Sequence, residues 1–323
     1  MEREESALTI EDLRTYFFTY NATVRAVDGV SLGIAKGKMV GLVGETGCGK
    51  SVTGFSIMRL IEKPGRIVGG RIIFEKEDLL KKSEAEMRKI RGSKISMIFQ
   101  DPMSSLNPVF KIGAQIIESI LKHKNVTKQE AKDEAVHVLE QVQMPDPPGT
   151  LNKYPHELSG GMLQRVIIAI AILCEPRIMI ADEPTSALDV TIQSQILRLI
   201  GDLNKEFHTS ILMITHDFGV LAMLCDQIAV MYAGNLVENA DTTAILKTPF
   251  HPYTQGLIKS IPTMTETKER LSTIRGFVPN LGNPPPGCIF HPRCDFAKKD
   301  CLKEKPGWVQ VEDGHWVSCF LYP

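Results

Sequence analysis

Short apolar runs bounded by glycine, proline and polar residues recur along the chain and predict buried strands. Such runs lie at 39–43, 71–74, 94–99, 177–182 and 211–217, and residues 24–38 have the pattern of further strands broken by glycine-containing turns. Apolar residues at helical spacing predict helices after Ser51, from about 112 to 173 with a proline-rich interruption at 144–150, and at about 189–207. Strands that alternate with helices indicate an α/β fold.

Composition and charge exclude several classes of protein. The chain has 323 residues, enough for one large α/β domain with an appendage or for two modest domains. Its net charge of −1 gives no basic field for nucleic acid. The longest apolar run, 166–174, is far shorter than the roughly 20 residues that cross a bilayer. With an acidic, polar start in place of a secretory signal, we expect a cytosolic or peripheral protein.

A phosphate-binding loop follows the first buried run. Its pattern, Gly44-x4-Gly49-Lys50-Ser51, lies between a predicted strand and a predicted helix, the context that a P-loop requires. Glycines let backbone N–H groups converge on phosphate oxygens, Lys50 reaches the β- and γ-phosphates, and the Ser51 hydroxyl can bind Mg²⁺. A glycine-rich turn with a chance lysine would lack these flanking elements. The expected ATP-contacting residues are Gly44, Glu45, Thr46, Gly47, Cys48, Gly49, Lys50, Ser51 and Val52.

Two consecutive carboxylates end a later buried run. Asp182 follows the strand "RIMIA" and can hold the metal directly or through water, while Glu183 can polarise an attacking water. Alone, such a pair would be compatible with a solvated loop. Together with the phosphate loop it indicates a Mg²⁺-dependent ATPase.

Further motifs occur in a characteristic order. "LSGGM" begins at Leu158, "SALD" at Ser186, and "THD" contains His216. This ordered set resembles the ATP-binding subunits of ATP-binding-cassette (ABC) transporters over roughly residues 8–240. The segments "FQDPMSSLNP" (99–108), "ELSGGMLQRV" (157–166) and "ADEPTSALDVTIQ" (181–193) are similar to the bacterial dipeptide and oligopeptide branch. In that branch Met162 is normal where other cassettes have glutamine, and Cys48 stands where serine is common in the P-loop.

The resemblance implies roles for these residues. Gln100 would connect the Mg²⁺–water site to the membrane subunit and act as a metal ligand, and His216 would contact the γ-phosphate. Ser159, Gly160 and Gly161 would form a second anion cradle, with Ser159 as the N-cap of a helix starting at Gly161. In the family this cradle serves the ATP bound by the other subunit, so catalysis by Glu183, His216 and Lys50 requires a dimer. ATP closes that dimer and hydrolysis lets it reopen.

Two further residues have alternative interpretations. Adenine needs an aromatic platform, for which Tyr20 is the first candidate and Phe17 or Phe18 are alternatives. These aromatic residues could equally be core residues of a strand. The thiol of Cys48 lies at a predicted helix N-terminus, which can lower its pKa, but a small residue filling a small space is the favoured interpretation.

The last part of the chain is unusually rich in cysteine. Four of the seven cysteines, Cys288, Cys294, Cys301 and Cys319, are separated by five, six and seventeen residues. This spacing by itself does not distinguish zinc, an iron–sulfur cluster or four unliganded thiols. A turn at Asp313-Gly314 predicts a hairpin that returns Cys319 toward the others. The resemblance favours a structural [4Fe–4S] cluster, with His291 and His315 as surrounding groups rather than ligands.

The resemblance therefore implies an ABC-type P-loop NTPase with a RecA-like core and mixed sheet, an antiparallel β subdomain, a helical subdomain at about 105–173, and a small metal-centred C-terminal extension. We expect the cassette at 1–240 and the extension at 241–323. The implied function is ATP hydrolysis that drives import of dipeptides or oligopeptides, or of nickel chelates, at the cytoplasmic face of the membrane. Two transmembrane permeases, a second identical or paralogous ATPase and an external peptide-binding protein would be its partners.

Two other classes compete with the importer. A soluble cassette ATPase that remodels ribosomes or DNA generally has two cassettes or long coiled coils, whereas this chain has one cassette and no sustained heptads. An iron–sulfur redox-sensing regulator would need an exposed, labile cluster and no membrane partner.

Overall fold

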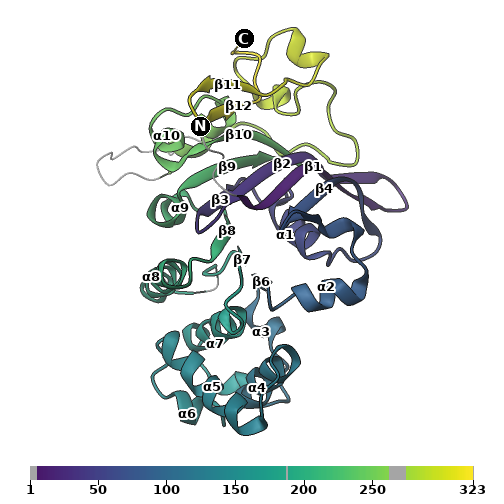
Figure 1. The fold of residues 1–323 in the computed structure, drawn as a ribbon. Helices are drawn as coiled ribbons and strands as arrows, with labels where there is room; N and C mark the ends of the chain where they lie inside the picture. The colour runs from purple at the N-terminus through teal and green to yellow at the C-terminus, as the bar shows by residue number, and fades with distance from the viewer. Residues whose placement is uncertain (1–5, 187, 262–273, 323) are drawn as a thin grey trace. The chain divides into compact units, whose positions relative to one another are not determined.

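Residues near the N-terminus form an antiparallel sheet in the computed structural model (Figure 1). Its strand order is β2-β1-β4-β5, with β1 at Ser6–Phe18, β2 at Thr23–Ala35, β4 at Gly65–Phe74 and β5 at Glu77–Asp78. Strand β1 was not predicted from the sequence. The reason is a bulge in its pairing with β4 between Glu11 and Arg14, which shifts the buried positions from Leu8 and Ile10 to Leu13 and breaks the alternation.

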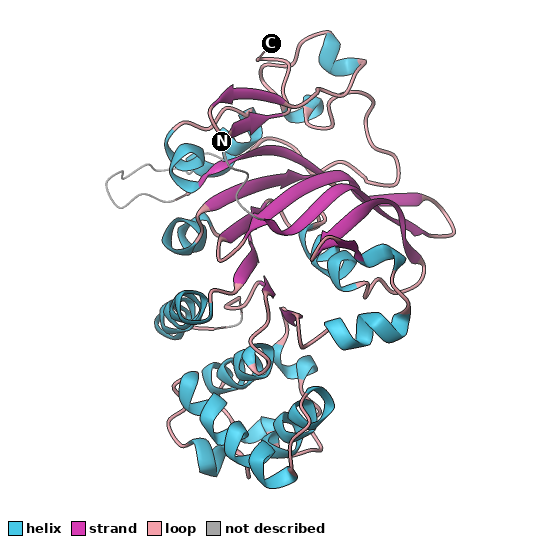
Figure 2. Cartoon of the chain, viewed as in Figure 1, coloured by secondary structure: helices cyan, strands magenta, loops and turns pink. Residues whose placement is uncertain are grey.

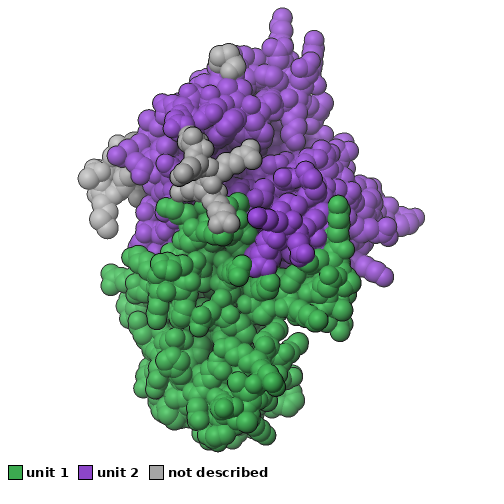
Figure 3. Space-filling view, in the orientation of Figure 1, with its two compact units in different colours: residues 1–7, 35–38, 81–212 green, residues 8–34, 39–80, 213–323 purple. Residues whose placement is uncertain are grey.

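The structure describes residues 6–186, 188–261 and 274–322, and the chain divides into two units (Figure 3). The strand-rich unit contains residues 8–34, 39–80 and 213–323, and the helix-rich unit contains 1–7, 35–38 and 81–212. Strand β8 (Ser210–Thr215) carries the chain from the helix-rich unit into the strand-rich unit. Within the described ranges, no helix combines the length and the apolar character that crossing a membrane would require.

A second sheet of the strand-rich unit contains the strand that precedes the phosphate loop. All five residues of β3 (Met39–Val43) are buried, and β3 runs parallel to β9 (Gln227–Tyr232). Next come β10 (Asn235–Asp241), β12 (His315–Val317) and β11 (Val309–Glu312), each antiparallel to its neighbour. The chain turns at Ala233-Gly234 between β9 and β10, and the predicted hairpin at Asp313-Gly314 is confirmed. The C-terminal hairpin therefore belongs to the same sheet as β3.

Short helices complete the strand-rich unit. Helix α1 (Lys50–Met58) follows β3, and α9 (Phe218–Leu224) packs against β3. The other helices are α10 at Thr242–Lys247 and α11 at Pro252–Lys259, with 3-10 turns at Leu79–Lys81, His291–Arg293 and Asp300–Leu302. A Cβ atom on Gly41 would lie 2.6 Å from Leu221 Cδ2, so β3 and α9 are in close contact. The sequence pattern did not predict α9, α10 or α11, because helices this short carry little periodicity.

The helix-rich unit contains two parallel strands, β6 (Ile95–Ile98) and β7 (Ile178–Asp182), and most of the long helices (Figure 2). The helices are α2 at Glu84–Ile90, α3 at Pro102–Ser105, α4 at Ile112–His123, α5 at Lys128–Gln141, α6 at Pro147–Thr150, α7 at Gly160–Ile172 and α8 at Val190–Phe207, with a 3-10 turn at Pro155–Glu157. The predicted helical region is therefore confirmed.

Packing in this region follows helical periodicity. Ile112, Ile116 and Ile120 of α4 lie one turn apart, are fully buried and form the apolar stripe that packs on α5. Burial of three such side chains contributes about 2 kcal/mol each. Thr127 caps α5 with a capping box to Glu130, so both the packing and the helix start are encoded locally.

A buried carboxylate joins the C-terminal hairpin to α11. Glu238 on β10 is fully buried and accepts hydrogen bonds from the backbone N–H groups of Phe250 (2.6 Å) and His251 (3.0 Å), and it pairs with His315 Nε2 on β12 (2.8 Å). His251 caps α11, where its Nδ1 accepts from Tyr253 N at 3.1 Å. Burial lowers the pKa of His251 to about 4, against a small opposing effect of Glu238.

We predict that His251 makes stability fall in acid. The unfolded chain binds a proton at this residue near its ordinary pKa of about 6.5, whereas the folded chain does so only near 4. The stabilisation is therefore complete above pH 6.5 and is lost as the pH falls toward 4, by about 3 kcal/mol in total. Urea unfolding midpoints at pH 7, 6, 5 and 4.5 measure this slope.

His251→Asn is the matched variant, because its side chain keeps a capping oxygen but does not titrate. Its midpoint should depend less on pH than that of the wild type. His208→Asn, at an exposed left-handed residue that asparagine tolerates, should leave the slope unchanged. An equal slope in all three proteins would contradict the assignment.

Candidate functional site

The phosphate loop has the predicted strand–loop–helix context. Buried β3 ends at Val43, the loop runs from Gly44 to Gly49, and α1 begins at Lys50. Gly49 is the N-cap residue with φ 106°, and Gly47 has φ 79°. Both values lie in the left-handed region that favours glycine, which turns the loop back over the helix N-terminus. The partial positive charge of that terminus makes the loop an anion site.

Neighbouring backbone leaves no room for side chains at two loop positions. A Cβ on Gly44 would lie 2.0 Å from the carbonyl oxygen of Met231, and one on Gly49 would lie 2.1 Å from that of Ala26. Strands β9 and β2 thus hold the loop from two sides. These glycines are required for the packing of the loop as well as for its dihedral angles.

Lys50 is held inside the loop. Its Nζ donates to the carbonyl oxygens of Gly44 (2.7 Å) and Glu45 (3.1 Å), and the residue is only 6% exposed. Cys48 is fully buried nearby, and burial raises the pKa of its thiol. The structure therefore supports Cys48 as a small space-filling residue and opposes the reactive-thiol alternative.

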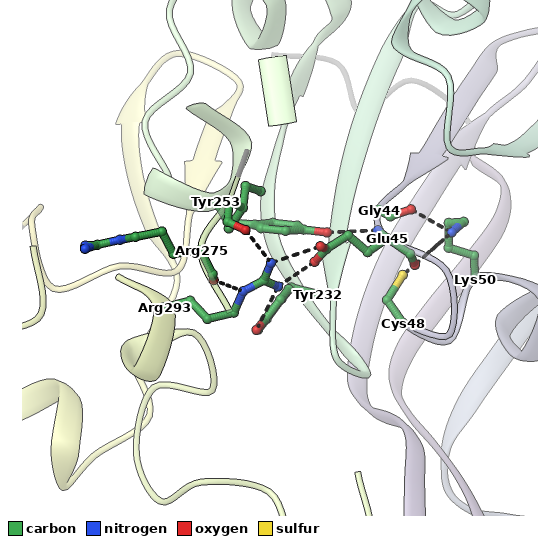
Figure 4. A network of polar contacts seen from close by, with 9 residues as sticks. Gly44, Glu45, Cys48, Lys50, Tyr232, Tyr253, Arg275 and Arg293 are labelled. Atoms are coloured by element: carbon green, nitrogen blue, oxygen red, sulfur yellow. Dashed lines mark hydrogen bonds and ion pairs between the residues drawn. The ribbon is translucent and has the colours of Figure 1, made fainter. Parts of the chain in front are cut away.

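Glu45 has partners that our sequence analysis did not identify (Figure 4). Its backbone N–H donates to the hydroxyl of Tyr253 at 2.9 Å, and its carboxylate pairs with the guanidinium of Arg293 at 2.7 Å. Arg293 also lies over the ring of Tyr232, 5.7 Å from its centroid. The one sequence signal for this network is the placement of Arg293 between two of the clustered cysteines.

The carboxylates of the second motif lie at the end of β7 in the helix-rich unit. Asp182 is 1% exposed, and Glu183 has a left-handed φ of 46°, which is uncommon for a residue with a side chain. Gln100 Nε2 donates to Glu183 Oε2 at 3.2 Å. Two predicted site residues that are far apart in sequence are therefore in direct contact.

The serine–glycine turn forms a helix N-terminus in the same unit. Ser159 is the N-cap of α7, and its hydroxyl accepts from Met162 N at 3.4 Å. The helix begins at Gly160, one residue earlier than predicted, and Gly160 is exposed. A Cβ on Gly161 would lie 2.6 Å from Ile192 Cγ2, so that glycine lets α7 approach α8. The arrangement leaves an accessible turn that is suited to anions.

The remaining candidates lie on the strand-rich unit. His216 follows β8 and is exposed, next to Asp217, which caps α9. Tyr20 is fully exposed in the turn between β1 and β2, whereas Phe18 is 43% exposed and Phe17 is partly covered. Tyr20 is therefore not a core residue. Ala187 of the "SALD" motif lies outside the described residues.

The clustered cysteines line one small cavity of about 10 Å³ in the strand-rich unit, together with aromatic residues that include Phe290 and Phe320. Burial, reinforced by the neighbouring thiols, raises the pKa of Cys288 to about 11, and burial also raises the pKa values of Cys294 and Cys319. His291 contacts the carbonyl of Cys288 and His315 pairs with Glu238. The hairpin thus returns Cys319 to the other cysteines, as predicted.

The expected metal-centred arrangement is not present. In the described ranges, no three histidine, cysteine, aspartate or glutamate residues are grouped closely enough to hold a metal ion. None of the four cysteines of the extension forms a disulfide bond. Donors of the right kind gather at one place, but their geometry is not that of a ligand set.

Two protein families match separate parts of the chain. Residues 27–186 match the ABC transporter family, and residues 237–301 match the C-terminal region of oligopeptide/dipeptide transporters.

Relatives match over almost the full length. The chain is 49% identical over 316 residues to the oligopeptide transport ATP-binding protein AppD of Bacillus subtilis (strain 168), covering 98% of this chain and 96% of that protein. It is 45% identical to the dipeptide transport ATP-binding protein DppD of Escherichia coli (strain K12), with the same coverage of both. A dimeric ATP-binding cassette solved in a post-hydrolysis state with ADP and Pi has a TM-score of 0.65 and 26% identity, over 73% of this chain and 98% of that one.

The substitution Gly49→Ala should disrupt the conformation of the phosphate loop. Its Cβ would collide with the carbonyl of Ala26, and φ of 106° is strained for alanine. We expect ATP affinity to fall at least about tenfold and stability to fall by more than about 1 kcal/mol. Titration calorimetry and thermal unfolding measure the two effects. Gly33→Ala, where a Cβ meets nothing within 4 Å, is the matched control, and equal affinities in both variants would contradict this account.

Proposed function

This chain belongs to the ATP-binding subunits of oligopeptide and dipeptide ABC transporters, and from that membership we propose which of its residues bind and hydrolyse ATP. It is the ATPase subunit of a peptide importer. The observation that carries the residue assignment is the phosphate loop, where a buried strand ends at a helix N-terminus and Lys50 is held inside the turn.

The loop would bind the triphosphate through backbone N–H groups of residues 44–52 and the ammonium group of Lys50. Lys50 now donates to carbonyl oxygens of Gly44 and Glu45, and phosphate oxygens are stronger acceptors because they are charged. Ser51, Asp182 and Gln100 would hold Mg²⁺, for which oxygen donors are the preferred ligands. The metal would neutralise charge that develops on the phosphoryl oxygens. The exposed ring of Tyr20 would stack on adenine.

Glu183 would act as the general base. It has a left-handed backbone conformation of the kind found at functional sites, and its carboxylate accepts a hydrogen bond from Gln100. His216, which is exposed after β8, would contact the γ-phosphate. Ser159, Gly160 and Gly161 would offer their helix N-terminus to ATP bound by a second subunit.

A cassette of this family works with membrane permeases and a second cassette. We place it on the cytoplasmic face of the membrane with two permease subunits, an identical or paralogous ATPase and, indirectly, an external peptide-binding protein. The family matches support a cassette at residues 1–240 and an extension at 241–323.

For the extension, we propose that Cys288, Cys294, Cys301 and Cys319 bind a [4Fe–4S] cluster, with zinc as the alternative. The donor set fits in kind and number, because four thiols line one cavity among apolar residues. Burial raises the pKa values of Cys288, Cys294 and Cys319 and so favours their protonated thiols, whose protons a bound metal centre would have to displace. A centre of this kind would stabilise a segment too small for a large core.

Glu183→Gln should slow hydrolysis by at least about a hundredfold and stabilise an ATP-bound dimer, because the amide cannot accept the proton of water. Phosphate release and light scattering on a size-exclusion column measure the two effects, with Mg²⁺–ATP and the physiological partner present. Glu140→Gln, at an exposed position on α5, should keep the wild-type rate.

Lys50→Ala separates binding from turnover, since it should weaken nucleotide binding itself. A normal hydrolysis rate in Glu183→Gln would show that another group is the base. If two subunits did not associate when ATP is present, the proposed ATP site shared by two subunits would be wrong.

Cys294→Ser should lose the cluster. We expect wild-type protein purified without oxygen to contain iron and a broad brown absorbance, and the variant to lose both. Elemental analysis for iron and zinc measures this, with Cys174→Ser in the helix-rich unit as the control that keeps its metal. Full iron in Cys294→Ser would contradict the ligand assignment, and zinc in the wild type would replace the cluster by a zinc site.

A further inference from the structure

The C-terminal extension contacts the phosphate loop through a partly buried ion pair. Arg293 Nη1 lies 2.7 Å from Glu45 Oε2, and Nη2 lies 3.0 Å from Glu45 Oε1. The side chain of Arg293 is 4% exposed and that of Glu45 is 29% exposed. A bidentate pair of this kind fixes both the position and the plane of the carboxylate. The two residues are 248 positions apart in sequence and lie in the same unit.

All remaining donors of the guanidinium are also used. Its Nε donates to the carbonyl of Arg275 at 2.8 Å, Nη2 is 3.5 Å from that of Ile274, and Nη1 is 3.4 Å from the hydroxyl of Tyr232. The guanidinium also lies over the Tyr232 ring. This pocket is built for an arginine, because lysine has neither the planar fork nor five donors.

A second contact holds the backbone of the same loop residue. Tyr253 on α11 is fully buried, and its hydroxyl accepts from Glu45 N at 2.9 Å. Its ring packs on Tyr232, with centroids 4.6 Å apart, and on Phe290, at 5.4 Å. Both the carboxylate and the amide of Glu45 are therefore held by residues beyond position 250.

Charge makes this contact important for a phosphate site. Glu45 directly follows Gly44, and Lys50 Nζ donates to the backbone carbonyls of both residues. An unpaired carboxylate at this position would repel a triphosphate and compete for the ammonium of Lys50. Pairing with Arg293 neutralises that carboxylate, and it also directs it away from Lys50 (Figure 4).

The position of Arg293 depends on the cysteine loop. Arg293 ends a 3-10 turn in which its N–H donates to Phe290 O at 3.0 Å, and Cys294 N donates to His291 O at 3.2 Å. Cys288 N is bonded to Cys301 O at 2.9 Å. The backbone that carries the guanidinium is thus organised by the same segment that gathers the cysteines.

We propose that Arg293 is a positioning residue for the phosphate loop, so that tight ATP binding requires a folded C-terminal extension. This inference rests on the proposed binding of ATP by that loop. Arg293 does not touch the nucleotide; it acts through Glu45, by cancelling a charge and by fixing the entrance of the loop. A simpler role for the pair is to anchor the extension, and the two roles predict different behaviour of double variants.

The test uses the full chain and titration with Mg²⁺ and AMP-PNP, an ATP analogue that is not hydrolysed. Arg293→Gln should raise the dissociation constant at least about tenfold, because it exposes the loop to an uncompensated carboxylate. Arg293→Lys should restore part of the affinity, since it returns the charge without the bidentate geometry. Arg275→Gln is the matched control, because that side chain is 78% exposed and points away from Glu45 in Figure 4.

The deciding variant combines Arg293→Gln with Glu45→Gln. If charge is the cause, the double variant should recover most of the lost affinity while its melting temperature stays below that of the wild type. Unchanged affinity in Arg293→Gln, or a double variant as weak as the single one, would overturn the proposal. Lys50→Ala separates it from the proposed function: if Lys50→Ala binds as tightly as wild type, the loop is not the ATP site and both ideas fail.

Discussion

Binding a triphosphate on backbone amides requires a turn that packs against its surroundings without side chains, and the strand-rich unit is organised around this requirement. Gly44 and Gly49 contact the carbonyls of Met231 and Ala26 so closely that a methyl group at either place would collide. The loop can hold this shape because β3 is buried along its whole length and paired with β9. The anion site is therefore a property of the sheet as much as of the loop.

The C-terminal segment packs in the same unit as the phosphate loop. Strand β12 pairs with β10, and buried Glu238 ties β10 to α11 and to β12. Arg293 and Tyr253 then contact Glu45 at the start of the phosphate loop. An extension that resembles an appendage in the sequence is therefore continuous with the sheet that carries the phosphate loop.

The groups expected to act on ATP are distributed over both units. The strand-rich unit holds the phosphate loop and His216, whereas the helix-rich unit holds Asp182, Glu183 and the turn at Ser159. Each set is organised by its own packing, as the hydrogen bond between Gln100 and Glu183 and the contact between Gly161 and Ile192 illustrate.

The sequence by itself determined the features that depend on neighbouring residues. The strand before Gly44, the helix caps at Thr127 and Ser159, and the turns at Ala233-Gly234 and Asp313-Gly314 follow from local dihedral preferences and short hydrogen bonds. The order of the motifs was sufficient to predict the ABC cassette and its ATPase activity. Local rules did not extend to β1, where a bulge interrupts the alternation.

Only the tertiary structure decided which distant groups meet and which are buried. It paired Glu45 with Arg293, buried Cys48, exposed Tyr20 and lowered the pKa of His251. The residues beside Glu45 do not indicate that it pairs with Arg293, because this contact depends on the packing of a whole sheet. Burial and charge pairing depend on everything that surrounds a side chain, and the chain must fold before those surroundings exist.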